Sequence, residues 1–406
     1  MRVAALMETF PAWSETYILW HISELVRAGE DVSIFPSTRG QASVVQPEVS
    51  ELRLLDRVIA PEHSAVEHRA VLRALARSLR RHPLSTLRLA REIAMARDAR
   101  GWTQSLSHLA LPGRVPSRFD VLHAYFGPAG RRADTLRAIG ALKGALVTSF
   151  LGFDANVLGA RLGGRYYEDL FRRAEVIGVS SEFMRRKLLA LGAPEARLRK
   201  LPLGLPLARF EFRSKPYNGG PLRLISVGRL AEVKGFVWGL RGVALAAARG
   251  HDVKLDIVGD GPLKQELLAE TAALKLGERV TFHGALPAEA TRRLMHDADV
   301  ALYSGVRARD GAEEALGGTV LEAQAMGLPV IASEVGGVCE GLVPGSSGLV
   351  VPPESPEAVA TAIEEMLART NEWPEMARRG RQHIEESFDS ARLHARWLAL
   401  YREIAG

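Results

Sequence analysis

The sequence predicts an α/β protein built from two Rossmann-like domains, each with a doubly wound parallel sheet. Three observations lead to this prediction. The chain has 406 residues, of which 47% are hydrophobic and 25% charged, a globular composition with room for two domains. Apolar runs typical of strands alternate with helical segments in two successive blocks. Between the blocks, residues 212–221 ("FRSKPYNGGP") carry Gly and Pro without periodicity and indicate a linker.

The first block, residues 1–211, opens with the strand-like run "RVAALME". The segment "SETYILWHISELVRAGE" follows with helical spacing, and Ser14 is its candidate N-cap. Further strands are expected at "DVSIFP", "DVLHAYF", "ALVTSFL", "EVIGVS" and "LRKLPLG". In the helix "SEFMRRKLLALG", Ser181 is the expected cap and Gly192 the expected stop.

The second block, residues 222–385, repeats the alternation. Its expected strands are "LRLISVG", "VKLDIVGD", "RVTFHG", "DVALYSG", "PVIASE" and "SGLVVP". Residues 386–406 form a terminal helix. Open α/β sheets bind ligands beyond the carboxyl ends of their strands, so a ligand is expected in a cleft between the two domains.

Composition narrows the function classes. No apolar run reaches the ~18 residues of a membrane span, and the N-terminus lacks a signal-peptide pattern. The single cysteine, Cys339, excludes an internal disulfide and a cysteine-based zinc cluster. A cytoplasmic enzyme is therefore expected. The net charge of +6 suits nucleic acid, anionic lipid or phosphorylated ligands, but arginine enrichment can also reflect a GC-rich genome.

The stretch "LISVGRLAEVKG" reads as strand, turn and helix. Gly228 allows a tight turn, and Arg229 and Lys234 place two cations over one loop near a helix N-terminus. This combination predicts an anion site suited to a diphosphate. The alternative is a solvated loop with incidental charges. The later stretch "VGDGPLKQEL" resembles a plain turn more than a phosphate loop.

The stretch "EEALGGTVLEAQAMGLPV" places two carboxylates around a helix start. Glu314 precedes the Gly317-Gly318 loop, and Glu322 lies about one turn inside the helix. The first helical amides, those of Gly318, Thr319 and Val320, are expected to face a diphosphate. Carboxylates on both sides suit a ligand with hydroxyl groups at both ends, such as a nucleotide sugar. The alternative is an acid favoured by the helix dipole and an ordinary amphipathic glutamate.

These motifs resemble the family 4 retaining glycosyltransferases, which have the GT-B fold. The E-x7-E element corresponds to Glu314 and Glu322, and the R-x4-K element to Arg229 and Lys234. "ETFPAWSETYI" is similar to the opening of a subgroup acting on exopolysaccharide and related acceptors. "SFDSARLHARWLALYREI" is similar to the terminal helix that returns to the first domain. The resemblance covers nearly the whole chain.

The resemblance implies site roles. Arg229, Lys234 and Glu314 would be catalytic: the two cations would stabilise the leaving diphosphate, and Glu314 would bind the donor sugar. Glu322 would bind the ribose, and the backbone at residues 282–286 would receive the base. The implied donor-binding set is Gly228, Leu286, Gly317, Gly318, Thr319, Val320 and Glu322. No metal and no cofactor are expected; a UDP- or GDP-linked sugar would be the co-substrate.

The acceptor side carries a departure from the family. Relatives commonly have a histidine where "SFLGFDAN" has Leu151, which favours a less hydroxylated group at that turn. His123 is a candidate substitute, but a strand-end histidine is more often a structural hydrogen-bonding group. The implied acceptor-side residues are Ser14, Glu15, Thr16, His123, Leu151, Gly152 and Asp154. Saccharides, lipid-linked molecules and natural products are all expected acceptor classes.

Residues 62–118 contain a basic stretch, best seen at residues 68–100, whose leucines share one helical face. A basic amphipathic helix can lie on anionic lipid, which would make the protein peripheral on the inner face of the membrane. The alternative is a solvated helix whose leucines face the core. Nucleic acid is not an expected partner, because no aromatic side chains interleave the arginines. A pseudo-glycosyltransferase or a catalytically silent nucleotide-sugar-binding protein remains an alternative function.

Overall fold

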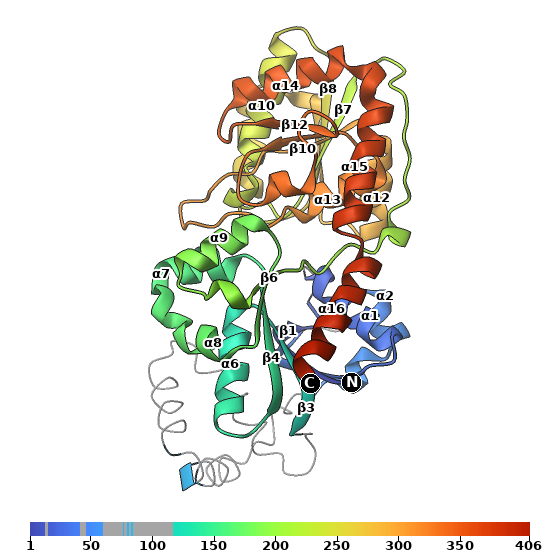
Figure 1. Cartoon of the computed structure of the whole chain (residues 1–406). Coiled ribbons are helices and arrows are strands. Elements are labelled where there is room, and N and C mark those ends of the chain that lie inside the picture. Colours follow the sequence, from blue (N-terminus) through green and yellow to red (C-terminus); the bar gives the residue numbers. More distant parts are fainter. Residues whose placement is uncertain (13–14, 41–45, 60–75, 77–78, 81–82, 84–116) are drawn as a thin grey trace. The chain divides into compact units, whose positions relative to one another are not determined.

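The computed structural model describes residues 1–12, 15–40, 46–59, 76, 79–80, 83 and 117–406 (Figure 1). The chain forms two compact units. The first contains residues 1–180, 184–204 and 390–406, and the second contains residues 181–183 and 205–389. Ser14 and, apart from residues 76, 79, 80 and 83, the helix expected at 68–100 lie outside the described residues.

The first unit contains a six-stranded parallel sheet within the described residues, in the order β2-β1-β3-β4-β5-β6. Its strands are β1 Arg2–Phe10, β2 Asp31–Arg39, β3 Arg118–Tyr125, β4 Lys143–Phe150, β5 Val176–Val179 and β6 Leu198–Lys200. Its helices include α1 Thr16–Arg27, α2 Pro47–Glu51, α6 Gly127–Ala138, α7 Ala160–Leu162, α8 Glu168–Arg173, α9 Glu182–Ala190 and α16 Ser390–Ala405. Helix α1 begins after Glu15, which makes no side-chain cap.

The last helix of the chain, α16, belongs to the first unit and lies beside α1 and β3 (Figure 1). Its Trp397 and Tyr401 are almost fully buried in the core of this unit. The Trp397 indole donates to the carbonyl of Pro202 at 3.2 Å. Burial of two aromatic side chains, each worth about 2–3 kcal/mol, explains why the C-terminal segment packs here.

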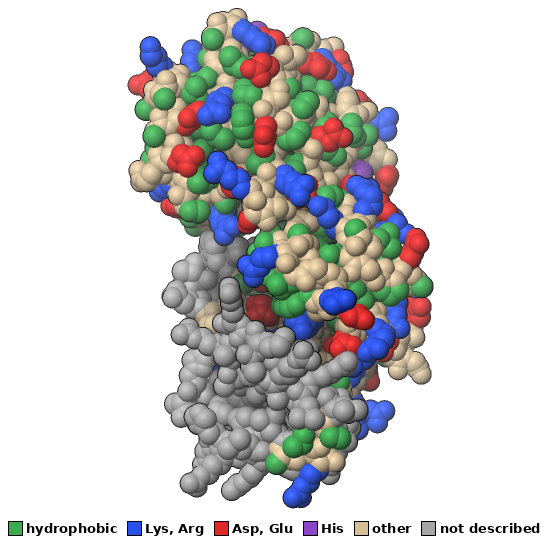
Figure 2. Space-filling view, turned by 90° about the vertical axis from the view of Figure 1, so that its left-hand side faces the viewer, with side chains coloured by type: hydrophobic (Ala, Val, Ile, Leu, Met, Phe, Trp, Pro, Cys, Tyr) green, Lys and Arg blue, Asp and Glu red, His purple; other side chains and the backbone are tan. Residues whose placement is uncertain are grey.

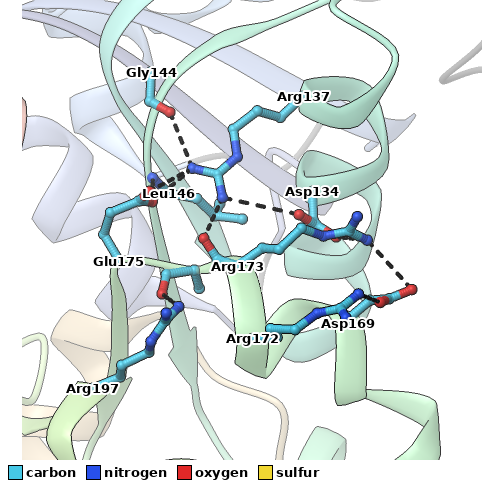
Figure 3. A network of polar contacts seen from close by, with 10 residues as sticks. Asp134, Arg137, Gly144, Leu146, Asp169, Arg172, Arg173, Glu175 and Arg197 are labelled. Atoms are coloured by element: carbon cyan, nitrogen blue, oxygen red, sulfur yellow. Dashed lines mark hydrogen bonds and ion pairs between the residues drawn. The ribbon is translucent and has the colours of Figure 1, made fainter. Parts of the chain in front are cut away.

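A network of polar contacts joins α6 to the strands and helix that follow it (Figure 3). The guanidinium of Arg137 donates to both carboxylate oxygens of Glu175, at 2.9 and 2.7 Å, and to the carbonyl of Arg173. Arg173 in turn forms an ion pair of 2.8 Å with Asp134, whose side chain is only 4% exposed. The network therefore ties α6 to the end of α8 and the start of β5.

The second unit contains another six-stranded parallel sheet within the described residues, in the order β12-β11-β10-β7-β8-β9. Its strands are β7 Leu222–Val227, β8 Val253–Val258, β9 Val280–Gly284, β10 Val300–Tyr303, β11 Val330–Ser333 and β12 Gly348–Val351. Its helices are α10 Phe236–Ala248, α11 Lys264–Ala273, α12 Ala288–Asp297, α13 Gly318–Met326, α14 Pro356–Ala368 and α15 Trp373–Ser387. Every strand expected from the sequence is present, and the parallel order confirms the doubly wound α/β prediction.

The unit boundary differs from the expected linker. The chain changes unit after residue 204, and residues 212–221 belong to the second unit. The amide of Arg213 donates to the carbonyl of Met326 at 3.1 Å, and the Tyr217 ring lies 5.1 Å from that of Trp373. These contacts hold the segment against the second unit although its sequence has no periodicity.

On the face that Figure 2 shows, Lys and Arg side chains lie interspersed with Asp and Glu side chains over the residues drawn in colour. The charged side chains on the coloured part of this face thus form no single basic field. No helix among the described residues is both long and apolar enough to cross a membrane.

Candidate functional site

A glycine-rich turn follows β7 and leads toward Lys234. A Cβ atom on Gly259 would lie 1.9 Å from the carbonyl oxygen of Gly228, so the turn after β8 approaches this turn backbone to backbone. The amide of Leu230 donates to the carbonyl of Asp260 at 3.0 Å. The backbone of the stretch "VGDGPL" therefore packs against the loop after β7 and hydrogen-bonds to it, as expected of a plain turn.

Lys234 and Glu314 form an ion pair of 2.8 Å between Nζ and Oε1. Lys234 ends the short 3₁₀ turn Glu232–Lys234 after β7, and Glu314 lies in the loop after β10. Both side chains are mostly buried, at 17% and 20% exposed, so water screens their attraction less than it would at the surface. The structure thus brings together the cation expected at the diphosphate and the acid expected at the sugar.

Arg229, the other expected cation, is exposed. Its side chain forms no hydrogen bond or ion pair with any residue in the described part of the chain. It follows Gly228 directly at the carboxyl end of β7, on the same edge of the sheet as Lys234. Its guanidinium therefore remains available to a ligand at this edge.

Helix α13 presents its N-terminus beside Glu314. Gly317 adopts the left-handed conformation (φ +69°), and the Val320 amide donates to the Gly317 carbonyl at 2.9 Å. The amides of Gly318 and Thr319 have no hydrogen-bond partner among the described residues. Two amides, not the three expected, are therefore open to an anion, because the first turn of the helix already uses that of Val320.

The loop that carries Glu314 is held by two glycines. The amide of Gly337 donates to the Glu314 carbonyl at 2.9 Å. A Cβ atom on Gly336 would lie 2.0 Å from the same oxygen, so no larger residue fits there without moving the loop. The stretch "EVGGV" thereby sets the backbone position of Glu314.

Glu322 lies in the second turn of α13 and is half-buried. Burial raises the pKa of this carboxyl to about 7, and the positive charges of Arg292 and Lys234 oppose the rise. A group with this pKa changes charge near neutrality. The carboxyl of Glu322 is therefore fully charged only above pH 7.

Arg292 and Tyr303 belong to the site but were not predicted from the sequence. Arg292 lies on α12, and its guanidinium is 5.7 Å from the ring of Phe210. Tyr303 is the last residue of β10, and its ring lies 5.5 Å from Lys234 Nζ. The sequence patterns singled out neither residue as a site residue, and only the tertiary structure places them near Glu322 and Lys234.

Leu286 lies between the edge strand β9 and helix α12, and it is half-buried. Strand β9 ends at Gly284, which has a φ of +69°. Beside it, His283 Nε2 lies 2.6 Å from Asp256 Oδ1. The segment expected to receive a base thus follows the carboxyl end of its strand, on the sheet edge that also carries Lys234.

In the first unit, Glu15 and Thr16 stand at the start of α1. Burial, and then the charge of Glu8, raise the pKa of the Glu15 carboxyl to about 7. Glu15 lines a small cavity of about 10 Å³ together with Phe10 and Gln46. These residues lie at the carboxyl end of β1, where the sequence placed an acceptor-side segment.

Asp154 organises the turn after β4. It is fully buried, and its carboxylate accepts hydrogen bonds from the amides of Gly127 and Gly152, both at 2.9 Å. Burial raises the pKa of Asp154 to about 6, although these hydrogen bonds oppose the rise. Leu151 is half-buried and packs against the core of the first unit. Asp154 therefore joins this turn to the start of α6.

His123 lies inside the first unit. Its Nε2 is 2.8 Å from Ser149 Oγ, its Nδ1 contacts the Tyr401 hydroxyl, and its ring stacks on Tyr125 at 4.3 Å. Burial lowers the pKa of His123 to about 3, so the imidazole is neutral. These contacts agree with the structural alternative, and His123 does not stand in for the histidine missing at Leu151.

Among the described residues, no three His, Cys, Asp or Glu side chains lie close enough together to hold a metal ion. The polar groups of the candidate site are three cations, two carboxylates and two open amides. Cations and amides suit a diphosphate, and carboxylates suit hydroxyl groups.

Residues 208–383 match the family model described as "Glycosyl transferases group 1". Over 410 residues the chain is 27% identical to WcaL of Salmonella typhimurium, named as a glycosyltransferase of colanic acid biosynthesis, with 100% of both chains covered. It is 26% identical to the amylovoran biosynthesis glycosyltransferase AmsK of Erwinia amylovora, with 89% of this chain and 90% of that protein covered.

Solved structures with the same fold include HepE from Anabaena in complex with UDP and glucose. The TM-score is 0.71 at 16% sequence identity, and the match covers 99% of this chain and 100% of that chain. At this identity the likeness concerns the fold alone. Together with the two parallel sheets, it confirms the expected GT-B fold.

Proposed function

Because the chain is a glycosyltransferase with a group 1 domain in its second unit, we propose that it moves a sugar from a nucleoside-diphosphate sugar to a hydroxyl acceptor, with retention of the anomeric configuration and without a metal. The single observation that carries the proposal is the Lys234–Glu314 ion pair beside the open amides of Gly318 and Thr319. A diphosphate needs cations and open amides, and the sugar attached to it needs a carboxylate that accepts hydrogen bonds from its hydroxyl groups, so both kinds of group must lie side by side.

In this proposal the diphosphate binds Arg229, Lys234 and the two amides. Glu314 accepts hydrogen bonds from the donor sugar, Glu322 accepts them from the ribose, and the base contacts the backbone near Leu286. A UDP- or GDP-linked sugar is the expected donor. UDP is the nucleotide in the HepE complex, which supports a UDP-linked donor sugar.

The acceptor oxygen attacks the anomeric carbon on the face from which the diphosphate departs. The bond between the anomeric carbon and the phosphate oxygen breaks, and the acceptor proton passes to the departing phosphate. Negative charge grows on that phosphate in the transition state. Arg229 and Lys234 stabilise it there, which is electrostatic catalysis that needs no protein nucleophile.

The acceptor is proposed to be a saccharide of exopolysaccharide assembly, free or carried on a lipid. The full-length similarity to WcaL and AmsK, whose names refer to colanic acid and amylovoran, supports this class. Glu15, Thr16, Leu151, Gly152 and Asp154 follow two strand ends of the first unit, where such an acceptor is expected. We place the protein in the cytoplasm, with peripheral contact to the inner face of the membrane.

The alternative is a pseudo-glycosyltransferase or a silent nucleotide-sugar-binding protein, favoured by Leu151 at the position of the family histidine. Transfer assays separate these functions. The protein is screened by thermal shift against UDP, GDP, ADP and their sugars, because a ligand at 100 times its Kd stabilises by about 2.7 kcal/mol. The donors that bind are then incubated with saccharide acceptors, and the linkage formed is read by NMR.

An α-linked donor that yields an α-linked product in excess chelator supports the proposal. Loss of turnover that magnesium or manganese restores contradicts the metal-free mechanism, and tight donor binding without transfer favours the silent alternative.

The variants Arg229→Ala and Lys234→Ala test the placement of the diphosphate at these two cations. Each removes a charge-assisted contact worth about 1.5–3 kcal/mol. Lys215→Ala is the matched control, because Lys215 forms a similar ion pair with Asp299 before the start of β10.

A further inference from the structure

Tyr303 is a buried tyrosine with an unsatisfied hydroxyl group. The residue is 6% exposed at the end of β10, and its hydroxyl has no hydrogen-bond partner among the described residues. Leaving a buried polar group unpaired is costly, and such a group calls for an explanation, such as a ligand, an ion or an ordered water. A phenylalanine would fill the same space without this cost, so the hydroxyl calls for an explanation.

The neighbours of Tyr303 are the two charged groups of the donor site. Lys234 Nζ lies 5.5 Å from the ring centroid and 2.8 Å from Glu314 Oε1. The cation thus lies within contact range of both the tyrosine ring and the carboxylate. The charge of Glu314 adds to burial in raising the pKa of Tyr303 well above its usual value, so the phenol keeps its proton and can donate it.

The backbone around Tyr303 is locked to the turn that carries Lys234. Ser304 Oγ donates to the carbonyl of Gly235 at 2.9 Å, and the amide of Val306 donates to the carbonyl of Val233 at 3.0 Å. A Cβ atom on Gly305 would lie 2.4 Å from the Tyr303 ring. The backbone of Gly305 therefore lies against the Tyr303 ring, and the segment after β10 is hydrogen-bonded to the turn that carries Lys234.

We propose that Tyr303 is a positioning residue. When a nucleotide binds, the Tyr303 hydroxyl replaces Lys234 as the partner of the Glu314 carboxylate. This inference rests on the proposed function. In the free protein Lys234 pairs with Glu314. A bound diphosphate draws Lys234 away, and the Tyr303 hydroxyl then donates a hydrogen bond to the carboxylate that Lys234 leaves. The exchange keeps the Glu314 carboxylate placed to accept hydrogen bonds from the donor sugar.

The test compares Tyr303→Phe with wild type and with Tyr125→Phe. Tyr125 is a suitable control because its hydroxyl is also buried and unpaired among the described residues, but it lies in the first unit. Calorimetry gives the Kd of UDP, GDP and the donor that the wild type binds. We expect Tyr303→Phe to weaken nucleotide and donor binding about tenfold, the effect of one hydrogen bond to a charged group. The melting temperature of the free protein should not fall, and Tyr125→Phe should leave binding unchanged.

A double-mutant cycle with Glu314→Ala shows whether the effect of Tyr303 on nucleotide binding depends on Glu314. If Tyr303 acts through Glu314, Tyr303→Phe has no further effect on nucleotide affinity once Glu314 is replaced. Equal nucleotide affinity in wild type and Tyr303→Phe would overturn the inference, and so would an undiminished effect in the Glu314→Ala background. A wild-type protein that binds none of the nucleotides or nucleotide sugars overturns the proposed function itself, which separates the two failures.

Discussion

Lys234 Nζ lies 2.8 Å from Glu314 Oε1, so in the free protein the expected phosphate-binding cation is held by the expected sugar-binding carboxylate. The two residues come from loops after different strands, β7 and β10, which lie side by side in the sheet. We expect a diphosphate that binds Lys234 to compete with Glu314 for this cation. In the proposed function, donor binding is therefore an exchange of partners at Lys234.

Replacing Glu314 by glutamine tests this exchange. The amide keeps the shape but removes the charge, so Lys234 becomes free for the diphosphate. We expect UDP or GDP to bind a few-fold more tightly, while kcat/KM for the nucleotide sugar falls about tenfold or more because a charged acceptor for the sugar is lost. Calorimetry and initial rates measure the two effects. Glu334→Gln is the control, and weaker nucleotide binding by Glu314→Gln would contradict the exchange.

Donor affinity should depend on pH through Glu322. Burial raises the pKa of this carboxyl to about 7. Ribose hydroxyls donate to its charged form, so bound donor favours loss of the proton. Affinity should rise as pH increases from 6 to 8, with a slope of at most about one decade per pH unit.

The ligand for this measurement is a nucleotide sugar and not a nucleoside diphosphate, because a terminal phosphate itself titrates near pH 6. The wild type should release a proton on binding near pH 7, detected by calorimetry in buffers of different ionisation enthalpy. In Glu322→Gln both the proton release and the slope should disappear. A slope that persists in this variant would assign the titration to another group.

Burial of the uncharged His123 should lower the stability of the first unit in mild acid, while the raised pKa values of Glu15 and Asp154 act in the opposite direction. The pKa of His123 is about 3 in the folded protein, below the usual 6.5, and the pKa of His21 is also lowered, mainly by burial. At these two histidines the unfolded chain binds more protons below pH 6.5, so their contribution to stability is lost as pH falls through 6.5. For His123 alone, the loss between pH 7 and pH 5 is about 2 kcal/mol.

Hydrogen exchange of the α16 amides at pH 7 and pH 5, corrected for intrinsic rates, measures this loss, because Tyr401 of α16 contacts His123. His123→Phe should reduce the pH dependence even if it lowers stability at pH 7. His283→Gln, in the second unit, is the control. The prediction is wrong if the exchange free energy of α16 changes equally with pH in wild type and His123→Phe.

Arg137 should contribute more to stability than its partly exposed position suggests. Its guanidinium, 20% exposed, bonds both oxygens of Glu175 and the carbonyl of Arg173 (Figure 3). Arg137→Met removes the donor to the Arg173 carbonyl and leaves Glu175 with the Leu146 amide as its donor, and we expect a loss of about 2–3 kcal/mol in the free energy of unfolding of the first unit.

Arg172→Met is the matched control for Arg137. Arg172 is 65% exposed and forms a single ion pair with Asp169, so its loss should cost only about 0–1 kcal/mol. Urea unfolding of both variants gives the comparison. Similar small losses in both would show that the Arg137 network contributes little.

The sequence by itself determined the order of strands and helices, because apolar runs of strand length, glycine stops and helix-start residues act over a few neighbouring positions. Strands such as "DVALYS" and the helix start at Gly317-Gly318 lie where local pattern placed them. Motif spacing also marked Arg229, Lys234, Glu314 and Glu322. Partners far apart in the chain leave no such local pattern.

Only the tertiary structure decided which of these groups meet. The parallel order β10-β7 brings Tyr303 and Glu314 to Lys234, and α12 brings Arg292 near Glu322. It also placed residues 212–221 on the second unit and buried His123 against Tyr401. The physical reason is that burial and charge pairing depend on contacts between segments distant in sequence. The pKa of Glu322 and the partner of Lys234 therefore follow from packing and cannot follow from residue type.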